Sequence, residues 1–222
     1  ASLQYLLRRT AKESGLELSD FSGAGMGFPG PVLPDGHCEV CVNLGWKAGN
    51  PQKELSGLLD GMPVKSGNDA NVAALGEMWQ GGGKGYKNLV MVTLGTGVGG
   101  GTLVGLSHKM LGVDTVAHIE QLCEDGDLSK VDLTIKDISR NDQFPGVNYN
   151  LTAANFGKLS DLADSSDIAL GIANMVAETI AMMAIFAARG HGVRDIVLTG
   201  NLTTIRPIRR VFEGLRDTFN VN

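Results

Sequence analysis

The sequence predicts an α/β fold in which a mixed sheet is flanked by helices. Apolar, strand-like runs alternate along the chain with segments of helical periodicity. Glycine-rich turns separate many of these segments, and glycine makes up 31 of the 222 residues. The hydrophobic share of 43% is sufficient to bury a core, and the length allows one large or two small domains.

Helices and strands alternate in the first part of the chain. In the last of its helices, the spacing of Val72, Leu75 and Trp79 predicts one buried face. The expected helices cover 2–15, 51–60 and 69–80, and the expected strands cover 23–32, 37–43 and 62–65.

The second part of the chain contains its most apolar segment, 168–188, which we expect to be a buried helix within a long helical region over 164–189. Asn174 and Glu178 interrupt it, so its uncharged stretches are shorter than the ~18 residues that a membrane helix needs. A strand over 99–104 is expected to pair back onto a strand over 88–94. The other expected elements are helices over 114–124 and 204–220, a strand or helix end at 132–137, a loop at 143–150 and a strand over 194–199.

Charge and cysteine content indicate which kinds of partner and which cellular location to expect. The net charge is −5 and no run of Lys and Arg occurs, so binding to nucleic-acid phosphates is not expected. The segment 2–15 resembles an amphipathic helix and not a secretory signal. Three cysteines do not form a disulfide framework. We therefore expect a cytoplasmic protein with no nucleic-acid or membrane partner.

The most informative segment is the glycine run that follows the strand expected over 88–94. Residues 94–101 read Leu-Gly-Thr-Gly-Val-Gly-Gly-Gly, with five glycines in eight positions. Without a Cβ, successive backbone amides can point into one concavity and hold an anion, and Thr96 and Thr102 add hydroxyl donors. The alternative is a tight glycine hairpin between two strands that binds no ligand.

Cys38 and Cys41 have the CxxC spacing of zinc and redox sites, and His37 lies beside them. On the strand expected there, positions i and i+3 point to opposite faces, and no second cysteine pair exists. We therefore interpret them as ordinary strand cysteines.

Two families resemble different parts of the chain. Gly-Asn-Asp-Ala-Asn at 67–71 and the glycine run, preceded by motifs at 27–32 and 42–46, resemble ROK-family glucokinases. Residues 1–101 carry that resemblance. Residues 99–222 resemble type II pantothenate kinases, through 99–106, 126–127, 132–137, 154–158 and 197–202. The junction falls in the glycine run that both families share, which suggests a chimera.

Both families belong to the actin/hexokinase-like ATPase superfamily, which implies an RNase H-like fold of two lobes. The expected lobes are a partial substrate-side lobe over 1–67 and a nucleotide-side lobe over 68–222. The superfamily's Asp-Gly-Gly-Thr-like first phosphate loop is missing, as are the zinc-binding cysteine cluster and the Glu-x-x-Gly-His motif of ROK kinases. Both ends are thus expected to be incomplete, and the sheet edge and apolar surface exposed there predict a homo-oligomer.

Asp69 is the candidate general base. Phosphoryl transfer from ATP to an alcohol needs a carboxylate that accepts the hydroxyl proton, and the ROK resemblance implies this role for Asp69. The alternative is that Asp69 caps the helix that follows, and both roles can hold. Asn43 and Asn68 resemble sugar-hydroxyl ligands, with turn residues as the alternative.

The resemblance also implies the nucleotide-binding residues. Gly157 resembles an adenine-side loop, and Gly200 with Asn201 is either a nucleotide contact or a plain strand-to-helix turn. Mg²⁺ would be held mainly by the ATP phosphates, and no protein ligand is named because the first-loop Asp is missing. The expected β- and γ-phosphate cradle consists of Gly95, Thr96, Gly97, Gly99, Gly100 and Gly101.

The sequence as a whole predicts an ATP-dependent kinase that transfers the γ-phosphoryl group to a primary alcohol. The acceptor is a hexose such as glucose, or pantothenate as in coenzyme A biosynthesis. The alternative is an inactive nucleotide-binding or scaffold protein, since losing one preorganised donor lowers a rate by ~10²–10³. A sugar-sensing regulator is least favoured, because no helix-turn-helix is found and the charge is negative.

Overall fold

The computed structural model describes residues 3–139 and 148–222, which form two compact units that divide between Gly85 and Tyr86. The units divide after Gly85, whereas the expected lobes divided after residue 67. Helix α3 (Asp69–Gln80) accounts for the difference, because it packs on the strands of the first unit.

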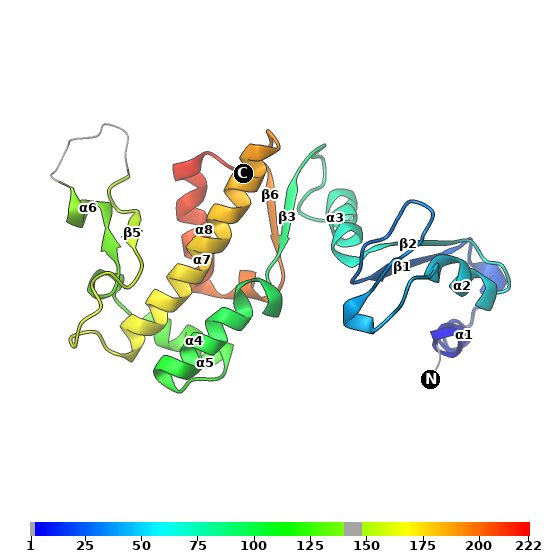
Figure 1. The fold of residues 1–222 in the computed structure, drawn as a ribbon, viewed down its shortest axis with the longest axis horizontal. Coiled ribbons are helices and arrows are strands. Elements are labelled where there is room, and N and C mark those ends of the chain that lie inside the picture. Colours follow the sequence, from blue (N-terminus) through cyan, green and yellow to red (C-terminus); the bar gives the residue numbers. More distant parts are fainter. Residues whose placement is uncertain (1–2, 140–147) are drawn as a thin grey trace. The chain divides into compact units, whose positions relative to one another are not determined.

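The first unit is built on two parallel strands, β1 (Ala24–Phe28) and β2 (Val64–Asn68), paired from Ala24–Val64 to Phe28–Asn68 (Figure 1). Helix α1 covers Leu3–Glu13 and helix α2 covers Pro51–Leu58. Asn50 begins α2, because its side chain accepts a hydrogen bond from the Lys53 amide at 2.9 Å. The expected helices and the strands around 23–32 and 62–65 are therefore confirmed.

Two expectations for this unit are wrong. The segment 37–43 is not a strand: it forms two isolated bridges, Cys38–Gly49 and Cys41–Trp46, and a 3₁₀ turn at Val42–Leu44. The chain reverses direction there at Gly45, whose φ of 66° favours glycine, so no extended run can develop. The predicted buried face of α3 is exposed, as the exposed fractions of Val72, Leu75 and Trp79 are 44%, 65% and 75%.

The second unit is organised around one helix, α7 (Ser165–Gly190), drawn in yellow and orange in Figure 1. Helices α4 (Gly101–Leu111), α5 (Val116–Glu124) and α8 (Arg206–Phe219) pack against it. The parallel strands β3 (Val90–Thr93) and β6 (Ile196–Thr199) complete the core. The helices expected over 114–124 and 204–220 and the strands around 88–94 and 194–199 are confirmed.

The N-terminus of α7 is closed by a reciprocal cap. The Asp164 carboxylate accepts the amides of Ser166 and Asp167, and Asp167 accepts the amide of Asp164 in return. By length and mean hydropathy (1.8), α7 is the helix of the described ranges that could cross a membrane. Since 61% of its most apolar window is buried inside the protein, it is a core helix, as the sequence predicts.

The second unit also contains a small two-stranded hairpin. Strand β4 (Leu133–Thr134) pairs antiparallel with β5 (Thr152–Ala154), and helix α6 (Ile135–Ile138) follows β4 directly. The segment 132–137 is thus both a strand and a helix start. The loop expected over 143–150 lies largely outside the described residues.

The sheet and the segment 99–104 differ from expectation. The described strands form three separate two-stranded sheets and not one mixed sheet. Residues 99–104 do not pair back onto β3, because Gly101 has right-handed helical angles (φ −62°, ψ −40°) and starts α4.

Candidate functional site

The candidate nucleotide site lies where β3 and β6 end. Because the strands are parallel, their carboxyl ends meet at one edge: Thr93 pairs with Thr199, and the Leu94 amide donates to the Thr199 carbonyl at 2.7 Å. Two segments leave this edge, which we call the glycine loop (residues 95–101) and the second loop (residues 200–204). Ligands of open α/β sheets bind outside the carboxyl ends of the strands.

The glycine loop is a single wide turn between β3 and α4. The amide of Gly100 donates to the Gly95 carbonyl at 3.0 Å, and the amide of Gly101 donates to the Thr96 carbonyl. Gly99 breaks the helical path with a φ of 86°. Both hydrogen bonds stay inside the loop, so two of the expected cradle amides close the turn.

Packing explains three of the five glycines. A Cβ on Gly100 would lie 2.7 Å from the Gly95 oxygen, and one on Gly101 would lie 2.8 Å from the Thr96 oxygen. Gly99 has a positive φ and close neighbours of its own. At Gly95 and Gly97, in contrast, a Cβ would meet no atom within 4 Å. Space for side chains therefore exists at these two positions, although the chain has glycine there.

The second loop packs directly on the glycine loop. Gly200 has a φ of 97°, and a Cβ there would lie 2.3 Å from the Leu94 oxygen. The Leu202 side chain is buried against Gly99, and its amide donates to the Leu94 carbonyl at 3.5 Å. The structure thus brings Gly200 and the exposed Asn201 beside the expected phosphate cradle.

Gly157 is not part of this group. A Cβ on Gly157 would lie 2.8 Å from the Leu133 Cβ and 3.0 Å from the Ala154 oxygen, inside the β4–β5 hairpin. Its amide closes a turn by donating to the Ala154 carbonyl at 3.1 Å. Close packing in the hairpin therefore accounts for glycine at this position.

A polar network that the sequence does not reveal fastens this hairpin to α7. The buried Asn174 donates to Asp132 at 2.8 Å, and Asp132 accepts the Phe156 amide at 2.8 Å. One turn further along α7, Glu178 accepts from Thr152 at 2.6 Å and from Asn155 at 2.9 Å. The i, i+4 spacing of Asn174 and Glu178 in an apolar helix is the signal that could have indicated it.

A second buried anchor is Asp167 near the start of α7. Its carboxylate accepts the amides of Asp164 and Asp127 and the ammonium group of Lys130 at 3.0 Å. The hydrogen bond from the Asp164 amide, with those from Asp127 and Lys130, lowers the pKa of Asp167 below its ordinary value.

The candidate general base lies in the first unit, where β2 meets α3. Asn68 is the helix cap: its Oδ1 accepts the Asn71 amide at 3.2 Å, and its Nδ2 donates to the Gly30 carbonyl at 3.2 Å. The alternative of Asp69 as the cap is therefore wrong. Asp69 is exposed in the first turn, with Oδ1 accepting the Ala70 amide at 2.9 Å.

The two candidate sugar ligands, Asn43 and Asn68, lie on different segments of the first unit. Asn43 is exposed on the 3₁₀ turn that follows Cys41. A Cβ on Gly30 would lie 3.3 Å from Cys41, and the Gly30 carbonyl binds Asn68 on its other side. Asn68 is thus held beside the segment that carries Cys41, two residues before Asn43.

Cys38 and Cys41 do not point to opposite faces. Both are buried beside Phe28, and the Cys41 thiol donates to the Pro29 carbonyl at 3.0 Å. The expectation was wrong because the segment is a reversing loop and not a strand. In the ranges 3–139 and 148–222, no group of three or more His, Cys, Asp or Glu could hold a metal ion.

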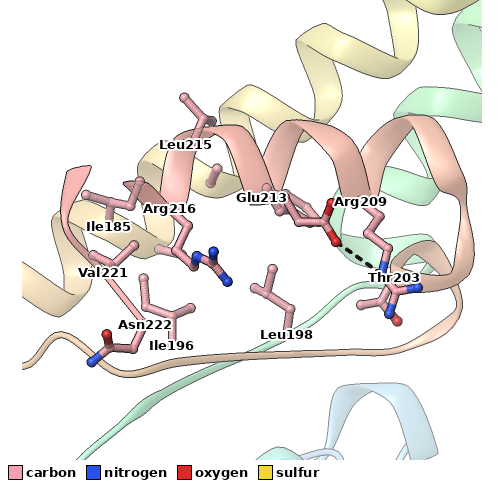
Figure 2. A pocket seen from close by; sticks show the side chains of 13 residues that line it. Ile185, Ile196, Leu198, Thr203, Arg209, Glu213, Leu215, Arg216, Val221 and Asn222 are labelled. Atoms are coloured by element: carbon pink, nitrogen blue, oxygen red, sulfur yellow. Dashed lines mark ion pairs between the residues drawn. The ribbon is translucent and has the colours of Figure 1, made fainter. Parts of the chain in front are cut away.

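A groove of about 360 Å³ opens between α7, β6 and α8 (Figure 2). Its walls are mainly apolar, and the ion pair of Arg209 with Glu213 (3.8 Å) lies at one side. The backbone of Asn222 runs along the edge of β6, accepting from Ile196 at 3.1 Å and donating to Arg194 at 2.9 Å. None of the predicted site residues lines this groove.

Comparison with known proteins matches both parts of the chain. The chain is 44% identical over 113 residues to a glucokinase from Halalkalibacterium halodurans, covering 49% of this chain and 34% of that protein. It is 34% identical over 129 residues to a type II pantothenate kinase from Oceanobacillus iheyensis, covering 57% and 49%. The chain thus spans half or less of the length of these relatives.

A solved structure from Cytophaga hutchinsonii, described as a sugar kinase, has a TM-score of 0.56 to this chain. The sequence identity is 17%, and the match covers 95% of this chain and 74% of that structure. At this identity the likeness concerns the fold alone, and it agrees with an actin/hexokinase-like α/β fold.

Two family models match, and their overlap contains the glycine loop. The ROK family matches residues 9–118 and Fumble matches residues 86–212. The predicted change of resemblance at this loop is therefore confirmed. Because its model covers more than half of the chain, the protein belongs to the Fumble family, with a ROK-like N-terminal part.

Proposed function

We propose that the protein is an ATP-dependent kinase that transfers the γ-phosphoryl group to a primary alcohol of a small molecule. The observation that carries this proposal is the open space at Gly95 and Gly97. Glycine lets a backbone approach a ligand closely, and packing within the protein does not require it at these two positions.

The donors around this space suit a polyphosphate. The amides that precede the turn-closing pair Gly100–Gly101, together with the exposed hydroxyl of Thr96, form the proposed cradle. Helix α4 begins at Gly101, so the positive end of its dipole faces the same loop. Mg²⁺ would be held mainly by the phosphates.

Asp69 is the proposed base. An ionised carboxylate has several acceptor lone pairs, and its hydrogen bond to the Ala70 amide uses one of them while orienting the group. The Asn68 cap fixes the start of α3 and hence the position of Asp69. The acceptor hydroxyl would donate its proton to the free carboxylate oxygen as phosphoryl transfer proceeds.

The acceptor is proposed to be a hexose or pantothenate, following the two groups of relatives. Asn43 is the more available of the two amides, because Asn68 already uses its side chain in the cap and on Gly30. The sequence-based expectations of a cytoplasmic location and of self-association are kept in the proposal. A monodisperse monomer in light scattering would contradict self-association.

Calorimetry with a non-hydrolysable ATP analogue and Mg²⁺ tests the site. Gly97→Val places a side chain in the cradle and should abolish binding. Gly105→Ala is the matched control, because Gly105 lies in α4 with no atom within 4 Å of its Cβ position. Binding by the Gly97 variant equal to that of the wild type would overturn the proposal.

Turnover assays separate the kinase from a nucleotide-binding scaffold. ATP consumption is measured with glucose and with pantothenate. Consumption that depends on one of these acceptors supports the kinase and identifies the acceptor. Analogue binding without consumption in either assay supports the scaffold.

A further inference from the structure

We infer that Ile180 of α7 is a positioning residue that holds the glycine loop in its nucleotide-binding shape. This inference rests on the proposed function. Gly99 is the residue of the loop with a positive φ (86°), and the position of its missing Cβ is crowded. The nearest atoms are Ile180 Cδ1 at 2.6 Å, Val176 Cγ1 at 3.0 Å and Leu202 Cδ1 at 3.3 Å.

Two of these side chains come from a rigid support. Val176 and Ile180 are spaced i, i+4 on α7 and are 4% and 2% exposed. On the same stretch of α7, Asn174 and Glu178 fasten the helix to the β4–β5 hairpin through side-chain hydrogen bonds. Ile180 is also β-branched, which restricts its χ1 angle. The helix therefore cannot readily move away from the loop.

Packing, and not backbone preference, selects the conformation of Gly99. Glycine adopts negative and positive φ about equally well, so Gly99 by itself does not define the path of the loop. The Ile180 methyl group fills the volume beside its Cα and leaves one arrangement. A change of φ at Gly99 would rotate the neighbouring peptide planes, and with them the amides that precede Gly100.

The same contact reaches the second loop through Leu202. This side chain touches the Cβ position of Gly99, while its amide binds the Leu94 carbonyl. Ile180 thus supports the nucleotide side of the site without touching the nucleotide, and we expect it to influence nucleotide affinity but not acceptor affinity.

Ile180→Val deletes the methyl group that meets Gly99 and keeps the β-branch. Ile185→Val is the matched control, because Ile185 lies on the same helix, is also 2% exposed and lines the groove beside α8. We expect similar losses of thermal stability in both. Only Ile180→Val should raise the Kd for the ATP analogue, by about tenfold, with the acceptor KM unchanged.

Gly99→Ala supplies a second readout. Its Cβ collides with Ile180 Cδ1, so its effect on the Kd should be smaller in the Ile180→Val background than in the wild type. Independent effects of the two substitutions would overturn the inference. Equal Kd values for wild type and Ile180→Val would overturn it alone, whereas absence of binding to the wild type would overturn the proposed function as well.

Discussion

The missing side chain of Gly200 and the carbonyl oxygen of Leu94 occupy the same space: a Cβ on Gly200 would lie 2.3 Å from that oxygen. This contact joins the ends of β3 and β6, from which both loops of the candidate site start. The shape of the candidate site therefore depends on the absence of a side chain at Gly200.

Gly200→Ala should lower the free energy of unfolding by about 2–4 kcal/mol, because the new methyl group collides with backbone and φ is 97°. Urea denaturation measures the change. Gly214→Ala is the control, since its Cβ would meet no atom within 4 Å in α8 and should stabilise by about 1 kcal/mol. Equal effects of the two substitutions would contradict the packing described.

Asp69→Asn should reduce acceptor-dependent ATP consumption by about 10²–10⁴-fold, because the amide cannot accept the hydroxyl proton. The Kd for the ATP analogue should not change. Asn68→Ala, which removes the cap bond to the Asn71 amide, should instead destabilise α3 by about 1 kcal/mol. Full turnover by the Asp69 variant would exclude it as the base.

Asp167→Asn should destabilise the second unit by about 3 kcal/mol. It replaces a buried carboxylate that accepts hydrogen bonds from two amides and from Lys130. The folded pKa lies below the ordinary value. The stabilisation is therefore complete above the unfolded pKa of about 3.9 and is lost as the pH falls through the folded pKa. Denaturation curves between pH 7 and pH 3 should show a steeper acid loss for wild type than for the variant.

Cys123 should resist alkylation in the native protein. Burial on α5, with a smaller contribution from Glu120, raises the pKa of this thiol to about 12, so little thiolate exists at neutral pH. Mass spectrometry after iodoacetamide treatment should find Cys123 labelled only when denaturant is present. Labelling of the native protein at pH 8 would show that the thiol is accessible.

Much of the fold could be predicted because helix signals in this chain are local. The long apolar run of α7, for example, defines a helix by its own residues. The face of α3 could not be predicted, because the spacing of Val72, Leu75 and Trp79 shows that a face is apolar but not what covers it.

The candidate site was predictable in part. The glycine run and Gly200 are visible as turns after apolar strands, and the structure brings them together. Their partners are not visible: Gly99 meets Ile180, and Gly157 belongs to a separate hairpin. The strand predicted over 99–104 was wrong for a related reason. Glycine permits both a hairpin and the turn into α4, and long-range packing decides between them.

The hydroxyl groups of Thr93 and Thr199 lie 3.4 Å apart although 106 residues separate them in the sequence. Strands so distant in sequence pair late in folding, because the entropy cost of closing a long loop precedes the stabilisation that their contact provides. A nascent chain leaving the ribosome would therefore present the glycine run without its neighbouring strand until almost the whole second unit has been synthesised. The nucleotide of the proposed function could then stabilise this edge only after β6 has been synthesised.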